Sequence, residues 1–267
     1  MLSRTLYDHR QWLHSASKGD MPQLEAWHAA GVLSDLNKIG SEWVEEGTAR
    51  SALHLAYLNN NFTYADRLLA LGFCDFTVDS YGQSPLHLLT RSPSRPDLVH
   101  MDHLLSAGHP AEISDHAGMT PLSYAVSLQW EEAARLLHRY GGIPTSDCLF
   151  AATMWENVSL VRFLMEAGLD PNICIDQERG SKALHFLAGS WKEEDDADPQ
   201  SPRRQIMQLL IDAGADTDAV MLSDNQAILV SSLFGTQQGA TLMRQMAAIA
   251  HCTLNDGGPR PPSLPRL

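Results

Sequence analysis

The stretch that decides the fold is Thr120-Pro121-Leu122-Ser123-Tyr124-Ala125, because variants of it recur along the chain. A second motif, in which an apolar run precedes a glycine, follows each variant, for example at Gly141. Paired motifs of this kind indicate an internal repeat, and a repeat determines the architecture of the whole chain. The other variants are Ser51-Ala-Leu-His-Leu-Ala56, Ser84-Pro-Leu-His-Leu-Leu89 and Lys182-Ala-Leu-His-Phe-Leu187.

The distance between the two motifs tests the repeat, since chance matches would not keep a constant spacing. Four segments keep a spacing of 21 residues, although the first motif has decayed in two of them. Two further segments are longer, one by three residues and one by eleven. We therefore expect six units in register, two of them with insertions. The regular segments are 10–31, 51–72, 120–141 and 147–168, and the longer ones are 84–108 and 182–214.

Each unit has the pattern of two short helices. Thr120 can cap the first helix, and Pro121 suits its first position, where a missing N–H costs nothing. Leu122 and Ala125 begin an apolar stripe at helical spacing, and the closing glycine fits a helix C-cap. Because neither helix could bury its stripe alone, the units must stack. The sequence predicts an all-α repeat solenoid.

The two motifs resemble the Thr-Pro-Leu-His-x-Ala and Leu-Leu-x-x-Gly-Ala-Asp signatures of ankyrin repeats. The best matches are Thr120-Pro121-Leu122, Pro85-Leu86-His87 and Ala213-Gly214-Ala215-Asp216. The resemblance implies helix-turn-helix units joined by β-hairpin-like fingers, in a domain over residues 1–250. The last fifteen residues hold four prolines and little to bury, which predicts a disordered Pro-rich tail at 251–267. The expected repeats are 10–42, 43–78, 79–114, 115–145, 146–176 and 177–218, with a degenerate cap at 219–250.

The resemblance also implies where a partner binds, since ankyrin proteins use the finger tips and the first helix of each repeat. The segments Asp79-Ser-Tyr-Gly82 and Asp115-His-Ala-Gly118 hold the Asp and Gly that such turns favour. We therefore predict partner-binding side chains on two fingers and on the neighbouring helices. The finger residues are Tyr81, Gln83, His116 and Met119, and the helix residues are Arg91 and Leu128.

Histidines occupy the same position in three repeats, at His54, His87 and His185. They could be a metal cluster, but they fall on different units. The preferred interpretation is that each imidazole bonds backbone in the turn of its own or a neighbouring repeat, as ankyrin histidines do. His100 and His103 share one helical face, yet no third ligand is evident nearby, so a metal-dependent enzyme is a remote alternative.

Two features suggest further contacts with a partner. Trp130, Trp155 and Trp191 fall at nearly equivalent positions of three repeats, either as exposed indoles or as residues that close the turn of their own unit. The insertion at 192–202 must loop out between two helices, and its acidic side chains either clasp a basic partner or stay solvated. Those side chains are Glu193, Glu194, Asp195 and Asp196.

The net charge and the absence of catalytic motifs argue against several classes of function. Asp and Glu outnumber Lys and Arg by 32 to 19, which disfavours nucleic acid and suits a basic protein, or simply keeps the chain soluble. No phosphate loop, catalytic motif, signal peptide or membrane span is present in the sequence, and the four cysteines lie far apart. We expect a cytoplasmic monomer without cofactor or metal.

The sequence thus favours a non-enzymatic module that docks or neutralises one protein. The decayed units and the acidity resemble small, stand-alone bacterial ankyrin proteins, including immunity proteins of secreted toxins. The alternative is an adaptor or host-directed effector that brings two proteins together.

Overall fold

The computed structural model describes residues 2–33, 50–73, 77–92, 97–176, 178–223 and 226–255, with side chains from residue 10 to residue 251. The chain divides into two compact units, Met1–Ile143 and Pro144–Leu267. Among the described helices, none has both the length and the apolar character needed to cross a membrane.

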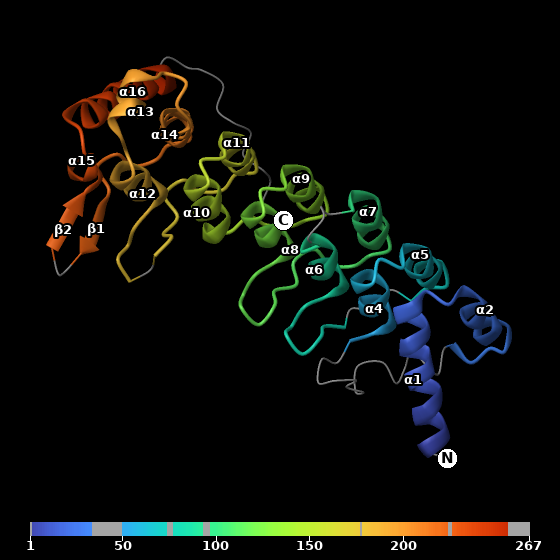
Figure 1. Cartoon of the computed structure of the whole chain (residues 1–267). Helices are drawn as coiled ribbons and strands as arrows, with labels where there is room; N and C mark the ends of the chain where they lie inside the picture. The colour runs from blue at the N-terminus through green and yellow to red at the C-terminus, as the bar shows by residue number, and fades with distance from the viewer. Residues whose placement is uncertain are drawn as a thin grey trace. The chain divides into compact units, whose positions relative to one another are not determined.

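The first unit consists of successive helix pairs (Figure 1). The first helices of the pairs pack in a row, α1 on α4, α4 on α6 and α6 on α8, and the second helices α5, α7 and α9 form a parallel row. The pairs are α1 (Leu2–Lys18) with α2 (Met21–Ala29), α4 (Ala52–Leu58) with α5 (Phe62–Ala70), α6 (Pro85–Thr90) with α7 (Leu98–Ser106), and α8 (Pro121–Ser127) with α9 (Glu131–Arg139).

The core of the first unit lies between these two rows of helices. Leu122, Ala125, Ala133 and Ala134 are completely buried. The alanines allow close approach of α8 and α9, which pack directly on one another. The apolar spacing of the sequence therefore becomes the contact surface between helices, and the predicted mostly helical repeat fold is confirmed.

The ends of α8 and α9 follow the predicted capping chemistry. The Thr120 hydroxyl accepts a hydrogen bond from the Ser123 N–H at 3.1 Å, and Pro121 occupies the first helical turn. Gly141 follows α9 with a φ of 96°, a left-handed conformation that costs a residue with a Cβ about 1–2 kcal/mol. The motif therefore fixes where each helix pair begins and ends.

The fingers of the first unit are hairpin-like turns closed by aspartates. The Asp79 N–H donates to the Gln83 carbonyl at 2.8 Å, and the Asp79 carboxylate accepts from the N–H groups of Tyr81 and Gln83. Asp115 makes the same contacts in the next finger. The His116 N–H donates to the Tyr81 carbonyl at 2.9 Å, so the two fingers are joined through their backbones.

The second unit repeats the helix pairs and adds a hairpin. Helix α10 packs on α11 and α12, and α14 packs on α11 and α16. Strands β1 and β2 are antiparallel, from Val220 opposite Leu229 to Ser223 opposite Gln226. The elements are α10 (Ser146–Met154), α11 (Val158–Glu166), α12 (Ala183–Gly189), α13 (Glu193–Ala197), α14 (Pro202–Asp212), β1 (Val220–Ser223), β2 (Gln226–Leu229), α15 (Val230–Leu233) and α16 (Gln237–Asn255).

The acidic insertion is folded, and its prediction as a loop is wrong. Residues 193–197 form helix α13, which packs on α14 and α16. The Asp195 side chain is buried, accepts hydrogen bonds from the Ser201 hydroxyl at 2.8 Å and the Lys192 N–H at 2.8 Å, and pairs with Arg203. A buried carboxylate is stable only with such partners, and here Lys192 and Ser201 within the insertion and Arg203 directly after it supply them.

The predicted C-terminal tail is partly helical. Helix α16 continues to Asn255, five residues into the segment 251–267 that was expected to be disordered. The remainder of that segment lies outside the described residues, as do residues 34–49 of the first two predicted repeats. The exact repeat boundaries stay predictions.

Candidate functional site

The three repeated histidines contact backbone in the turn of their own repeat, as predicted, and two of them also reach the next finger. His54 Nδ1 lies 2.7 Å from the Ser51 hydroxyl, and its Nε2 lies 2.9 Å from the Gln83 carbonyl. His87 links Ser84 to the Met119 carbonyl in the same way, at 2.9 and 3.1 Å. His185 Nδ1 accepts from the Lys182 N–H at 3.1 Å. His54 and His87 therefore support the turns of a repeat and its neighbour, and His185 supports the turn of its own repeat.

Burial of the histidine rings makes stability depend on pH. Burial lowers the pKa of His109 to about 4, although the adjacent Pro110 carbonyl acts in the opposite direction. Burial also lowers the pKa values of His87 and His185. Because these pKa values lie below the unfolded value of about 6.5, the unfolded chain binds more protons at acid pH. The stabilisation is complete above pH 6.5 and is lost as the pH falls toward 4.

We therefore expect the free energy of unfolding to fall by about 2 kcal/mol between pH 7 and pH 5 from His109 alone. Urea unfolding at the two pH values measures this difference. His109→Gln should reduce the pH dependence, whereas His116→Gln, at an exposed finger position, should leave it unchanged. An equal slope in all three proteins would contradict the assignment to buried histidines.

The predicted finger residues divide into exposed and buried side chains. Tyr81 is 57% exposed and His116 is also exposed, so both are available to a partner. Met119 is half-buried. Gln83 is buried, and its prediction as a contact residue is wrong, because its backbone closes the Asp79 turn and receives the His54 ring.

The two helix residues predicted to contact a partner, Arg91 and Leu128, lie at the ends of the first helices that are remote from the fingers. Arg91 and Leu128 are exposed and directly follow α6 and α8, about 10 Å along the helix from the fingers. The Arg91 guanidinium lies 5.0 Å from the centre of the Tyr124 ring, and the Tyr124 hydroxyl donates to Asp115 at 2.6 Å. This chain of contacts connects the helix end to the finger.

The three tryptophans have different environments. Trp155 is 54% exposed and Trp130 is half-buried. Trp191 is only 5% exposed, so its prediction as a surface anchor is wrong. Its ring packs edge-on against Phe234 at 5.4 Å, and its Nε1 donates to Asp196 at 2.9 Å. The folded insertion and the C-terminal helices cover it.

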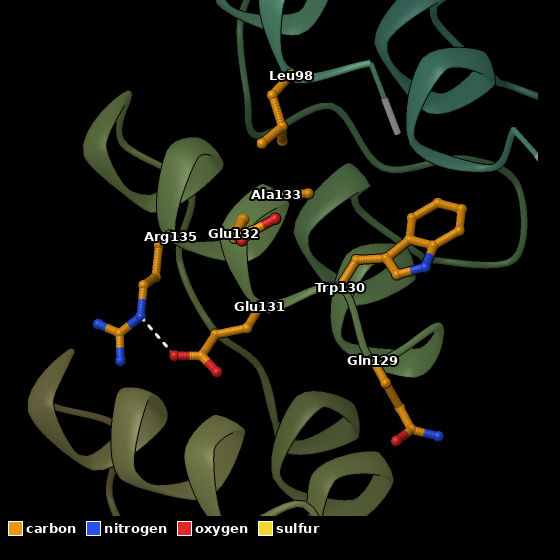
Figure 2. A pocket seen from close by; sticks show the side chains of 7 residues that line it. All are labelled: Leu98, Gln129, Trp130, Glu131, Glu132, Ala133 and Arg135. Atoms are coloured by element: carbon orange, nitrogen blue, oxygen red, sulfur yellow. Dashed lines mark hydrogen bonds and ion pairs between the residues drawn. The ribbon is translucent and has the colours of Figure 1, made fainter. Parts of the chain in front are cut away.

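Trp130 lines a surface pocket of about 380 Å³ beside the turn between α8 and α9 (Figure 2). Glu131 is held by Arg135 at 2.8 Å, as the dashed line in the figure marks. Glu132 is exposed, and the indole points away from the Glu131–Arg135 pair. An aromatic face near a carboxylate suits a cationic side chain.

A larger groove of about 500 Å³ lies in the second unit, between α10, α12 and the hairpin. Its accessible lining is mostly apolar, and the Phe150 and Phe186 rings meet there edge to face at 5.4 Å. Met221 and Leu233 complete the apolar wall, and all four side chains are half-buried. The charged residues at its rim are Asp147, Asp176, Arg179 and Lys182.

Solved structures share this arrangement of helix pairs and fingers. The ankyrin repeat domain of Bcl-3, of the IkappaB family, matches with a TM-score of 0.67 and 20% identity, over 87% of this chain and 97% of that one. The chain has an ankyrin-repeat fold. A domain from Acinetobacter baumannii AYE matches with a TM-score of 0.59 and 21% identity over 74% and 97%, and human ASB11 with 0.57 and 21% over 93% and 98%. No family model and no curated protein sequence matches the chain.

Within this ankyrin-repeat fold, one groove residue could have been recognised from its position in the repeat motif, although the sequence analysis did not single it out. Phe186 is the fifth residue of the motif Lys182-Ala-Leu-His-Phe-Leu187. The fifth residues of the other three variants, Leu55, Leu88 and Tyr124, are also half-buried. This position therefore faces away from the stack in several repeats. An aromatic residue there marks a surface side chain, although its apolar character alone suggests core.

Proposed function

We propose that this ankyrin-repeat chain is a non-catalytic module that holds one protein partner through the apolar groove of its second unit. The observation that carries the proposal is the pair Phe150 and Phe186, which are half-buried and lie on first helices beside the hairpin. Neither ring is fully covered by the stack. A partner that covered them would remove apolar area from water, which is the main favourable contribution to association.

The groove has the composition of an interface centre with a polar rim. Aromatic and methionine side chains are enriched at the centres of protein interfaces, and charged residues are found at their edges. Two rim charges already have partners, since Arg179 lies 3.7 Å from Asp176 and Lys182 lies 3.7 Å from Asp216. The partner is therefore expected to contribute an apolar or aromatic side chain rather than a strong charge at this point.

Phe186→Ala is expected to weaken partner binding by about 2 kcal/mol, roughly 30-fold in the dissociation constant, as for an interface anchor. Titration calorimetry with the partner recovered from the native host measures the change. Ile249→Ala is the matched control, because Ile249 is an exposed apolar residue of α16 that does not line the groove. Circular dichroism establishes that both variants are folded. Equal affinity of the two variants would rule out the groove as the anchor site.

The finer proposal is that binding neutralises the partner, as an immunity protein neutralises its toxin in the cytoplasm. The net charge of −13 and the Trp130 pocket with its exposed carboxylate at Glu132 suit a basic partner. Cys148 and Cys174 form no disulfide with another cysteine of the described part of the chain, as is usual in a reducing compartment. Suppression of the partner's toxicity on co-expression tests this role, and a partner that is harmless alone would exclude it.

The second candidate is an adaptor that binds two proteins. It is favoured by the separate surfaces of the two units, the exposed Tyr81 and His116 in the first and the Phe186 groove in the second. An adaptor would lose one partner on Tyr81→Ala and a different one on Phe186→Ala. If both variants lose the same single partner, the adaptor role is excluded and the neutralising role remains.

A further inference from the structure

Three metal-ligating side chains converge on the second helices of the first unit. Asp66 comes from α5, and His100 and His103 come one turn apart from α7, which packs on α5. His103 Nδ1 lies 3.1 Å from one Asp66 carboxylate oxygen, and His100 Nε2 lies 3.4 Å from the other. All three ligand atoms lie within 4.8 Å of one another.

The surroundings of His100 orient its ring toward Asp66. Phe62, one turn before Asp66 on α5, stacks on the imidazole with ring centres 4.2 Å apart and an angle of 18°. On the opposite nitrogen, His100 Nδ1 lies 2.9 Å from an Asp97 carboxylate oxygen, in an ion-pair contact rather than a well-directed hydrogen bond. Histidine ligands of metals commonly have a carboxylate at the second nitrogen, which fixes the ring.

We propose that Asp66, His100 and His103 bind Zn²⁺ and join two consecutive repeats across α5 and α7. Two imidazoles and one carboxylate are a known three-residue zinc set, in which water takes the fourth position. Zinc bonds of about 2.0–2.1 Å in a tetrahedron place neighbouring ligand atoms about 3.4 Å apart. The contacts of Asp66 with His103 and His100, one to each carboxylate oxygen, are 3.1 and 3.4 Å, so small side-chain adjustments bring the three ligands to this spacing. Imidazole ligands disfavour Mg²⁺ and Ca²⁺, which take oxygen ligands.

The site is separate from the proposed partner groove, because its residues lie on second helices of the first unit. Bound Zn²⁺ would therefore act on the stability of the repeat stack. A metal that binds only the folded chain stabilises the contact between α5 and α7. Without metal, the same geometry is explained by direct contacts of the two histidines with Asp66. Metal titration separates these two accounts.

The experiment is calorimetric titration of the untagged full chain with ZnCl₂ at pH 7.5, with thiols kept reduced. Wild type is expected to bind one more equivalent of Zn²⁺ than Asp66→Asn or His103→Gln, and neither of these two variants should show the rise in thermal midpoint that Zn²⁺ causes in wild type. Asp97→Asn should keep the site and weaken it about 10-fold, since Asp97 acts through His100. His116→Gln, at an exposed finger histidine, is the matched control and should bind as wild type.

Asp66 and His103 are chosen because both are partly exposed, so their replacement does not open the core. If wild type, Asp66→Asn and His103→Gln bind the same number of Zn²⁺ ions, the cluster is an ion-pair group and the proposal is overturned. The proposal is also overturned if the wild-type chain binds no Zn²⁺.

Discussion

Leu122→Ala is expected to lower the free energy of unfolding by about 2–5 kcal/mol, the largest effect that we predict for a single core residue. Leu122 is fully buried, and one of its methyl groups would lie 3.1 Å from a Cβ at Gly142, so it fills the space between α8 and the end of α9. Truncation removes apolar contacts and leaves a cavity that short, closely packed helices cannot easily close. Urea unfolding followed by circular dichroism measures the loss.

Tyr81→Ala is the comparison for Leu122→Ala, since Tyr81 is more than half exposed on a finger. Its replacement should change stability by less than about 0.5 kcal/mol, as surface substitutions usually do. Equal destabilisation by the two variants would contradict the division into stacking residues and surface residues.

Arg203→Met is expected to destabilise the second unit by about 3 kcal/mol, because it leaves the buried Asp195 carboxylate without its counter-ion. The Arg203 guanidinium bridges Asp195 at 3.2 Å and Glu156, and so connects the acidic insertion to the turn after α10. The Asp195 side chain is 4% exposed, so water cannot replace the lost partner. Differential scanning calorimetry is expected to show a lower midpoint for the second unit.

Two further variants separate the ion pair from the loss of the arginine side chain as such. Arg204→Met is the matched control. Arg204 is the next residue after Arg203, but unlike Arg203 its side chain makes no ion pair within the part of the chain that the structure describes. It should change stability little. Adding Asp195→Asn to Arg203→Met should recover part of the lost stability, because no unpaired charge then remains buried. A loss from Arg203→Met as small as that from Arg204→Met would contradict the structural role of Asp195.

The repeat could be predicted from the sequence because stacking imposes it on every unit. Each helix pair needs a cap such as Thr120, an apolar residue such as Leu122 and a closing glycine such as Gly141, at fixed distances. These requirements are local, so they are visible along the chain. The histidine contacts of His54 and His87 were predictable for the same reason, since each ring serves the turn next to it.

The surface and the ligand cluster depend on contacts between distant residues and could not be predicted in this way. Trp191 is buried by Phe234, and nothing in either segment indicates that they meet. Asp66 completes the cluster of His100 and His103 from a different repeat, so the histidine pair lacked a third ligand in the sequence. The Phe150–Phe186 groove forms between two repeats of the second unit, one of which has a decayed motif.

Amide hydrogen exchange of the wild-type chain, with and without the partner isolated from its native host, tests the central claim most directly. The account predicts a stoichiometric complex in which protection increases in the groove-lining segments of α10, α12 and β1 and at residues 179–182. It predicts no increase along the middle of α16, around Ile249. Protection confined to α16, or failure to recover any stoichiometric protein partner, would contradict it.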